Sequence, residues 1–325
     1  MGKLSHIIPL LIAVYLIFII FFFPKDLSTK ASTMEPAPSN PESTTSNEPT
    51  APSTKESTIS NEPTRMPAFF IGHGGPTLVA EKGPYMDYLK QFRKTIPKPE
   101  AIIIFSAHWE ESTQTIGFVF NEYPTIYDFS GFPSEFYKMK YPAKGDPKLA
   151  QEVHDLLKKN GIKSQADFKR GLDHGAWTIL KLMYPDADIP VVSMSVNTWG
   201  APEEMYKIGL SLAPLRERGV LILGSGATVH NFGTADFSKQ GNAKPAKFAK
   251  EFNDWLDKQL KEWNTEEMFN YAKRAPNVKI AVPRAEHFIP LIYAMGAGGD
   301  VKKTTTVQSN YVYGGGYSYM VWRFD

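Results

Sequence analysis

Cysteine is absent from this chain of 325 residues. Its absence excludes a disulfide framework and every thiolate metal site, so a bound metal must be held by nitrogen and oxygen ligands. A strong net charge is missing too, because 36 Lys and Arg side chains stand against 34 Asp and Glu side chains, for a formal charge of +2. Without a basic stripe or a large positive field, the chain is not expected to bind nucleic acid.

A long apolar run near the start of the chain predicts a membrane anchor. Residues 8–23 read IPLLIAVYLIFIIFFF. With the preceding residues they make a segment of about 20 residues, long enough to cross a bilayer. A cleaved signal peptide is the alternative, but the apolar run is longer than a usual signal core and no clear A-x-A site follows. We therefore predict a single-pass anchor over residues 1–24 and a membrane location, with no charge asymmetry that selects an orientation.

Residues 25–67 have the composition of a disordered linker. They are rich in Ser, Thr, Pro, Glu and Asn, and they contain a near-repeat, ESTTSNEPT followed by ESTISNEPT. Such a segment has too few apolar side chains to compensate for the entropy lost on ordering. The remaining residues, 68–325, are long enough for one domain with a substantial core.

Short apolar runs alternate with amphipathic segments in residues 68–325, which predicts an α/β fold. The runs AIIIFSA and VLIL are apolar throughout, as expected of strands that are buried on both faces. Residues 147–161 and 245–260 carry apolar side chains at helical spacing. The alternation predicts a single domain with a central sheet flanked by helices, and the extra aromatic strands, including YSYMVWRF at 317–324, indicate that the sheet is mixed.

Five of the seven histidines lie at the ends of predicted strands or in glycine-rich turns: His73, His108, His174, His230 and His287. His73, His108 and His230 each follow a separate predicted strand. Because ligands bind beyond the carboxyl ends of strands in such sheets, we expect these three imidazoles to meet at one edge. Imidazole is the commonest metal ligand and the usual acid or base at neutral pH. His174 precedes a predicted helix, whose dipole disfavours its protonated form.

Two further features are candidates for the site. Glu286 lies beside His287, and either side chain could bind a metal. The segment 123–137, YPTIYDFSGFPSEFY, is rich in aromatic residues and proline, which favours a loop that covers an aromatic substrate.

The motifs GHGGP, SAHWE, GLDHGAW, GSGATVHN and EHFIPL occur in this order along the chain. In order and approximate spacing they resemble the class III extradiol ring-cleaving dioxygenases, and most closely the DOPA 4,5-dioxygenase branch. The resemblance spans residues 67–325. It implies one divalent metal ion per chain, Zn²⁺ or Fe²⁺, with His73, His108 and His287 (or Glu286) as ligands. It also implies that His230 is a further ligand or an acid/base and that His174 contacts substrate or dioxygen.

The resemblance implies that a small catechol such as DOPA reacts with O₂ to give a muconate semialdehyde. An all-histidine site would depart from the two-His, one-carboxylate triad of ferrous oxygenases and favour zinc. Two alternatives stay open from the residues alone. The same histidines could activate water on zinc for hydrolysis, or the domain could be a binding module on the same fold.

Overall fold

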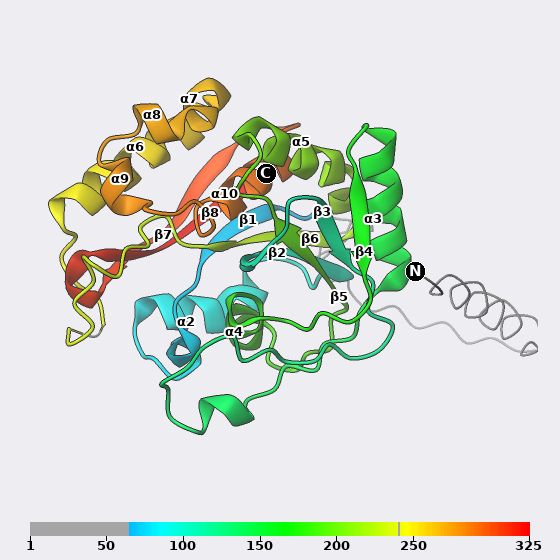
Figure 1. Ribbon diagram of the computed structural model, residues 1–325, viewed down its shortest axis with the longest axis horizontal. Coiled ribbons are helices and arrows are strands. Elements are labelled where there is room, and N and C mark those ends of the chain that lie inside the picture. Colours follow the sequence, from blue (N-terminus) through cyan, green and yellow to red (C-terminus); the bar gives the residue numbers. More distant parts are fainter. Residues whose placement is uncertain (1–64, 240) are drawn as a thin grey trace, which may run out of the picture. The chain divides into compact units, whose positions relative to one another are not determined.

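An eight-stranded sheet forms the centre of the computed structural model, which describes residues 65–239 and 241–325 (Figure 1). The strand order is β4-β3-β5-β2-β6-β1-β8-β7. The strands are β1 Ala68–Gly72, β2 Ala101–Glu110, β3 Gln114–Gly117, β4 Ser164–Asp167, β5 Val191–Val196, β6 Val220–Gly226, β7 Thr304–Val312 and β8 Tyr317–Phe324. The four central strands, β5, β2, β6 and β1, are mutually parallel, whereas β3 and β8 pair antiparallel to them. The predicted mixed α/β sheet is confirmed.

The helices lie on both faces of the sheet (Figure 1). The α-helices are α2 Pro84–Gln91, α3 Pro147–Lys159, α4 His174–Met183, α5 Pro202–Leu212, α6 Lys247–Lys261, α7 Thr265–Phe269, α8 Tyr271–Arg274, α9 Val278–Ala281 and α10 Ile289–Ala297. The 3-10 helices are η1 Pro76–Val79, η2 Phe92–Lys94, η3 Phe136–Lys138, η4 Ala213–Arg218 and η5 Tyr313–Gly315. Helix α3 begins where Asp146 accepts a hydrogen bond from the Leu149 backbone, a typical N-cap.

Alternation along the central strands divides the core into two layers. In β1, Phe70 packs with α3, α5, α6 and α10, whereas Phe69 and Ile71 pack with α2 and α4 on the opposite face. Strand β2 alternates in the same way, with Ile103 on the first face and Ile102 on the second. Both faces are therefore covered, which explains why these strands read as unbroken apolar runs in the sequence.

The edge strands β4 and β7 were missed in the sequence. Strand β4 is half-buried or exposed along its whole length, and the first part of β7 is similar. Edge strands pack on few neighbours, so their side chains carry little of the apolar signal that marks a central strand. Strand β8, by contrast, has the bounds 317–324 that the sequence predicts.

The described part of the chain begins inside the core. Met66, placed in the linker by the sequence, is buried, and its backbone N–H donates to Arg216 O at 3.0 Å. No helix within residues 65–239 and 241–325 is both long and apolar enough to span a bilayer. The anchor predicted for residues 1–24, and the predicted linker up to residue 64, lie outside the described residues.

Arg216 joins the beginning of the domain to its last helix, and its loss should destabilise the fold. Its guanidinium is 1% exposed and donates to Met66 O at 2.6 Å and to Ala297 O at 2.8 Å. Arg216→Ala leaves two buried carbonyl groups unpaired, so we expect the free energy of unfolding to fall by roughly 2–4 kcal/mol. Urea denaturation measures the change.

Arg218→Ala is the matched control on the same 3-10 helix. The Arg218 side chain is 60% exposed and pairs with Glu152 at the surface. Its loss should cost less than about 1 kcal/mol. Equal destabilisation by the two substitutions would contradict the role given to Arg216.

Candidate metal centre

The parallel strands bring the predicted histidines to one edge of the sheet. His73 follows β1 directly, His108 lies near the end of β2, and His230 follows β6. His174 is the first residue of α4, and His287 precedes α10. All five side chains line one cavity of about 1170 Å³. The convergence expected from the sequence is therefore present in the structure.

Three of the imidazoles form a compact group at the base of this cavity. One ring nitrogen from each of His73, His108 and His287 lies within 4.8 Å of the other two. The Nε2 atoms of His73 and His108 are 3.0 Å apart. Two nitrogens that bind one zinc ion at about 2.0–2.1 Å are about 3–3.5 Å apart. The spacing of His73 and His108 fits two ligands of a single divalent ion, and His287 lies close enough to be a candidate third.

A hydroxyl group sets the tautomer of His73. Ser225 Oγ lies 2.8 Å from His73 Nδ1, and the same hydroxyl donates its proton to Gly175 O at 2.5 Å. Because a serine hydroxyl has one proton to give, Nδ1 of His73 must be the donor to Ser225. The lone pair then resides on Nε2, which faces His108 and is free to bind a metal.

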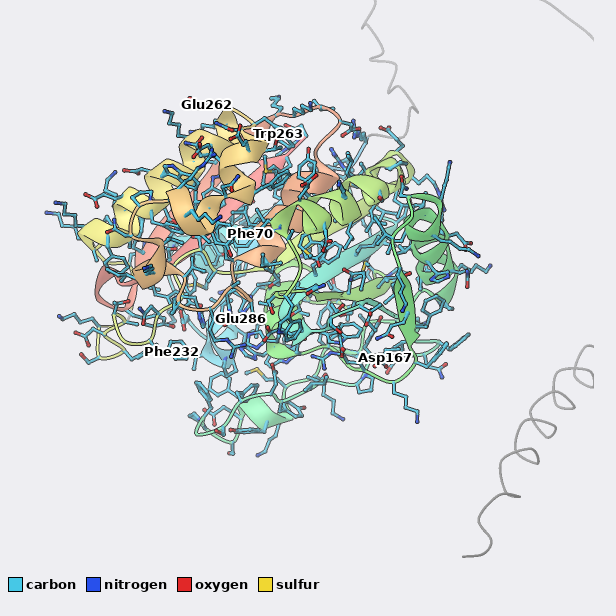
Figure 2. All side chains as sticks on the ribbon, turned by 45° about the horizontal axis from the view of Figure 1, so that its top comes forward. Phe70, Asp167, Phe232, Glu262, Trp263 and Glu286 are labelled. Carbon is cyan, nitrogen blue, oxygen red and sulfur yellow. The ribbon has the colours of Figure 1, made fainter. Side chains whose placement is uncertain are left out.

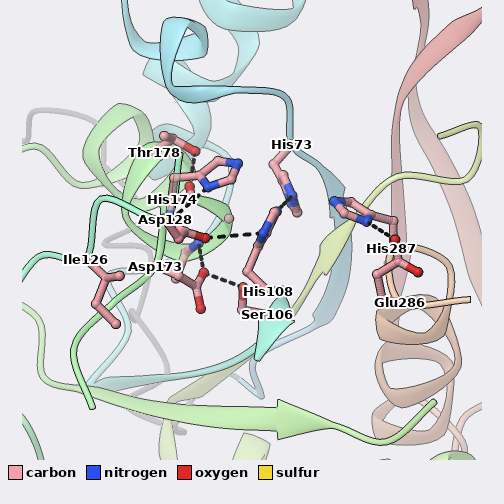
Figure 3. Close-up of polar contacts among 12 residues, drawn as sticks. His73, Ser106, His108, Ile126, Asp128, Asp173, His174, Thr178, Glu286 and His287 are labelled. Carbon is pink, nitrogen blue, oxygen red and sulfur yellow. Dashed lines mark hydrogen bonds and ion pairs between the residues drawn. The ribbon is translucent and has the colours of Figure 1, made fainter. Parts of the chain in front are cut away.

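His108 is aimed into the cavity by an irregularity in β2. From Phe105 to Glu110, β2 runs beside only the span from Met194 to Val196 of β5, so the pairing register shifts there. Such bulges redirect side chains next to functional sites. Asp128 Oδ2 lies 3.2 Å from His108 Nδ1 on the other side of the ring, which leaves Nε2 toward the cavity (Figure 3).

The backbone around His108 is held by a second set of polar contacts. Arg170 donates to His108 O at 2.9 Å and to the Asp173 carboxylate at 3.1 Å. Asp173 also accepts a hydrogen bond from Ser106 Oγ at 2.5 Å and caps helix α4. Asp173 directly precedes His174 in the sequence, but its contacts lie with these neighbours. Asp128 contacts the His174 ring instead.

His287 completes the group, and Glu286 supports it. Glu286 Oε1 lies 3.2 Å from His287 Nδ1, and Glu286 Oε2 lies 3.3 Å from Arg284 Nε. Figure 3 shows one nitrogen of His287 directed at Glu286 and the other toward His73 and His108. Of the two ligands that the resemblance allows here, the geometry favours His287. Its carboxylate neighbour orients the ring, as partners of metal-binding histidines commonly do.

Burial keeps these imidazoles neutral. It lowers the pKa of His73 and of His287 well below the ordinary value, and neighbouring histidines add to the effect. Burial, followed by the charge of His174, also lowers the pKa of His108 to about 4. Burial alone would raise the pKa of Asp128, but contacts with His174 and His108 lower it to about 2. Neutral imidazoles beside an ionised carboxylate are the protonation states that metal binding requires.

His174 and His230 flank the group on opposite sides. Asp128 Oδ1 accepts a hydrogen bond from the His174 backbone at 2.9 Å and lies 3.0 Å from its Nδ1. That second contact lacks the alignment of a hydrogen bond. The His230 ring stacks on His287 with centroids 3.6 Å apart and planes 8° apart. One of its ring nitrogens lies within 4.8 Å of a Glu286 carboxylate oxygen and of a His287 ring nitrogen, and its assignment as a fourth ligand stays a prediction.

Aromatic side chains form the walls above these polar groups. Phe129, Phe132 and Phe136 come from the segment 123–137 and line one side. Phe232 and Phe237 line the cavity too and are 64% and 50% exposed, and Figure 2 shows Phe232 and Glu286 on the same side of the molecule. The aromatic loop expected to cover a substrate thus lies at the cavity. An apolar-walled pocket with a few convergent polar groups is typical of a small-molecule site.

A family model described as "Catalytic LigB subunit of aromatic ring-opening dioxygenase" matches residues 67–321. The chain belongs to the class III extradiol ring-cleaving dioxygenases. It is similar to the 4,5-DOPA dioxygenase extradiol of Beta vulgaris, with 43% identity over 261 residues that cover 79% of this chain and 95% of that protein. The 4,5-DOPA dioxygenase extradiol of Escherichia coli K12 is 37% identical over 237 residues, which cover 72% and 85%.

A solved structure has a similar fold. The crystal structure of an uncharacterized protein from Escherichia coli K12 has a TM-score of 0.69 and 31% identity, covering 80% of this chain and 100% of that one. The chain is therefore an aromatic ring-opening dioxygenase of a metal-dependent family.

Asp128 and Ser225 are two functional positions that the sequence reading missed. Asp128 lies inside the aromatic segment 123–137. A carboxylate among aromatic residues was the feature of the sequence that could have indicated a role at the site. Ser225 lies in the Gly-Ser-Gly stretch that ends β6. Both act on histidines far away in the chain, so neither contact follows from local sequence.

Gly175 allows helix α4 to approach the metal-binding group, and a side chain there should disturb it. A Cβ at this position would lie 2.8 Å from His108 Cδ2 and 3.0 Å from His73 Cε1. Gly175→Ala should therefore displace both rings and weaken metal affinity by about 10–100-fold, as expected when ligand support is lost. Titration of the metal-free protein with Zn²⁺ measures the change.

Gly75→Ala is the matched control, because a Cβ there meets Phe132 at an ordinary 3.6 Å. We expect its metal affinity to equal that of the unsubstituted protein. If both variants bind the metal equally well, the close packing of Gly175 does not support the site.

The depressed histidine pKa values predict acid sensitivity of the metal-free protein. His108 and His230 have folded-state pKa values of about 4, lowered chiefly by burial. Unfolded histidine titrates near about 6.5, so the unfolded chain binds more protons between these values and stability falls as the pH drops. Each histidine contributes up to roughly 1.4 kcal/mol per pH unit in this window.

Urea denaturation of chelator-treated protein between about pH 7 and about pH 4.5 tests this slope. His230→Gln removes one of the titrating groups, so the free energy of unfolding should depend less steeply on pH. An unchanged slope would show that His230 is not buried in its neutral form.

Proposed function

We propose that this chain cleaves the ring of a small catechol outside its two hydroxyl groups, using O₂ and one divalent metal ion. His73, His108 and His287 would hold the ion, and His230 is a further ligand or an acid/base. The observation that carries the proposal is the orientation of the three rings. Each Nδ1 faces an oxygen atom of Ser225, Asp128 or Glu286, which leaves three Nε2 atoms for the metal.

A divalent ion in this position supplies Lewis acidity to the phenolic oxygens of the substrate and, when it is iron, an electron path to dioxygen. The group of His73, His108 and His287 contains no carboxylate. It therefore departs from the two-His, one-carboxylate triad of ferrous oxygenases, which favours Zn²⁺ over Fe²⁺ as the more tightly held ion. Both ions are therefore compared in the experiment below.

His174 and His230 are proposed to move the protons. Each lines the cavity beside the metal-binding group. His230 is neutral above about pH 4, so it can accept a phenolic proton from a bound catechol. His174 is positioned by Asp128, whose Oδ1 lies 3.0 Å from its Nδ1. From this position the His174 ring can donate a hydrogen bond to the dioxygen substrate.

The aromatic walls would orient the substrate and exclude water. Phe129 lies 5.8 Å from the His174 ring, edge to face, and Phe232 lies 4.9 Å from the His230 ring. A planar catechol between these walls keeps its hydroxyl groups toward the histidines. Relatives from Beta vulgaris and Escherichia coli bear the name 4,5-DOPA dioxygenase extradiol, so DOPA is the first substrate to test. Extradiol cleavage of DOPA gives a muconate semialdehyde.

Two classes of histidine variant separate metal binding from proton transfer. His73→Ala, His108→Ala and His287→Ala should each lose the bound ion and catechol turnover together. His174→Gln should retain the ion but lose turnover by about 10²–10⁴-fold, the usual contribution of a general base. Metal analysis, O₂ consumption and absorbance of the yellow product are measured after anaerobic loading with Fe²⁺ or Zn²⁺.

His154→Ala is the control, because His154 lies on α3 and bonds Ser164 away from the cavity. It should keep both the ion and the activity. The proposal requires one O₂ consumed per catechol. It fails if no catechol is consumed with either metal, or if the alanine variants of the three ligands bind metal normally.

A further inference from the structure

Two charged residues of the cavity lining, Glu81 and Lys82, take no part in the chemistry described above. Both follow the 3-10 helix η1 in the chain. The other carboxylate in the described lining, Asp128, already contacts His108 and His174. Glu81 is thus the carboxylate of this lining that remains available to a ligand.

The Glu81 carboxylate is held in place before any ligand binds. Thr77 Oγ1 donates to Glu81 Oε1 at 2.9 Å, and Tyr313 OH donates to the same oxygen at 3.1 Å. Among the described residues no hydrogen bond reaches the second oxygen, Oε2. A carboxylate fixed through one oxygen, with the other open, is preorganised to accept a hydrogen bond from a cation.

The donor Tyr313 stays protonated under ordinary conditions. Burial, followed by the negative charge of Glu81, raises the pKa of Tyr313 to about 12. Its hydroxyl also lies 3.2 Å from that of Tyr319. The Glu81 carboxylate is therefore oriented by a neutral hydroxyl donor.

A continuous aromatic wall connects Glu81 to the metal-binding histidines. Tyr317 OH donates to His73 O at 3.0 Å, and its ring lies 5.4 Å from the His230 ring. The Tyr313 ring, which contacts Glu81 through its hydroxyl, lies 5.7 Å from the Tyr317 ring. A catechol at the histidines that extends along this wall would bring its side chain to Glu81.

We propose that Glu81 is a specificity-determining residue that binds the ammonium group on the side chain of the catechol substrate. The inference rests on the proposed function and adds to it the charge of the substrate. Lys82, the next residue, lies exposed at the same lining and carries the opposite charge, which suits the carboxylate of an amino-acid side chain. The site thus matches an amino-acid catechol better than a neutral or purely anionic one.

Three catechols of similar size test this assignment with the metal-loaded enzyme. DOPA carries an ammonium and a carboxylate group, dopamine carries only the ammonium group, and 3,4-dihydroxyphenylpropanoate carries only the carboxylate group. Glu81→Gln keeps an oxygen that can accept the Thr77 and Tyr313 hydrogen bonds but removes the charge. We expect kcat/KM to fall about tenfold or more for DOPA and dopamine, mainly through KM. For dihydroxyphenylpropanoate it should stay unchanged or rise.

Glu262→Gln is the charge-matched control, since Glu262 is exposed at the end of α6, away from Phe232 and Glu286 (Figure 2). It should leave kcat/KM unchanged for all three catechols. Turnover of dihydroxyphenylpropanoate by Glu81→Gln also reports that the variant is folded and holds its metal. The inference is overturned if Glu81→Gln lowers all three values equally or changes none of them.

The two proposals can fail separately. If the unsubstituted enzyme consumes all three catechols but Glu81→Gln leaves their ranking unchanged, ring cleavage stands and the role of Glu81 falls. If the metal-loaded enzyme consumes none of the three, ring cleavage falls and the role of Glu81 falls with it.

Discussion

The parallel pairing of β1, β6 and β2 is the constraint on which the site depends. Parallel strands end at the same edge of a sheet, so His73, His108 and His230 arrive there from segments far apart in the chain. The strands can be apolar throughout because helices cover both faces. Burial at this edge lowers the pKa values of His73, His108 and His287, which keeps their rings neutral.

Oxygen acceptors behind the rings decide which nitrogen each histidine offers. Ser225, Asp128 and Glu286 come from three different parts of the fold, yet each lies at an Nδ1 atom. Asp128 has a double role, because it supports His108 and also lies against His174. One carboxylate thus orients two of the imidazoles that line the cavity.

The cavity has two polar regions in its lining. The five histidines form one region, and Glu81 belongs to the other. Tyr313, in η5 between β7 and β8, and Tyr317, at the start of β8, lie between the two regions. Under the proposal for Glu81, substitutions there would alter the preferred substrate and leave the imidazoles in place.

The sequence by itself determined the α/β class, the buried central strands and the five histidines, because alternation, apolar runs and glycine-rich turns are local properties. It left His287 and Glu286 as alternative ligands, and it missed Asp128, Ser225 and the edge strands β4 and β7. The tertiary structure alone placed Asp128, Ser225 and the two edge strands. Asp128 meets His174 across 46 positions of the chain, and Ser225 meets His73 across 152. The packing of distant segments determines these contacts. Sequence alone does not show that the irregularity in β2 redirects His108, or that Gly175 lacks a side chain where His73 and His108 pack against it.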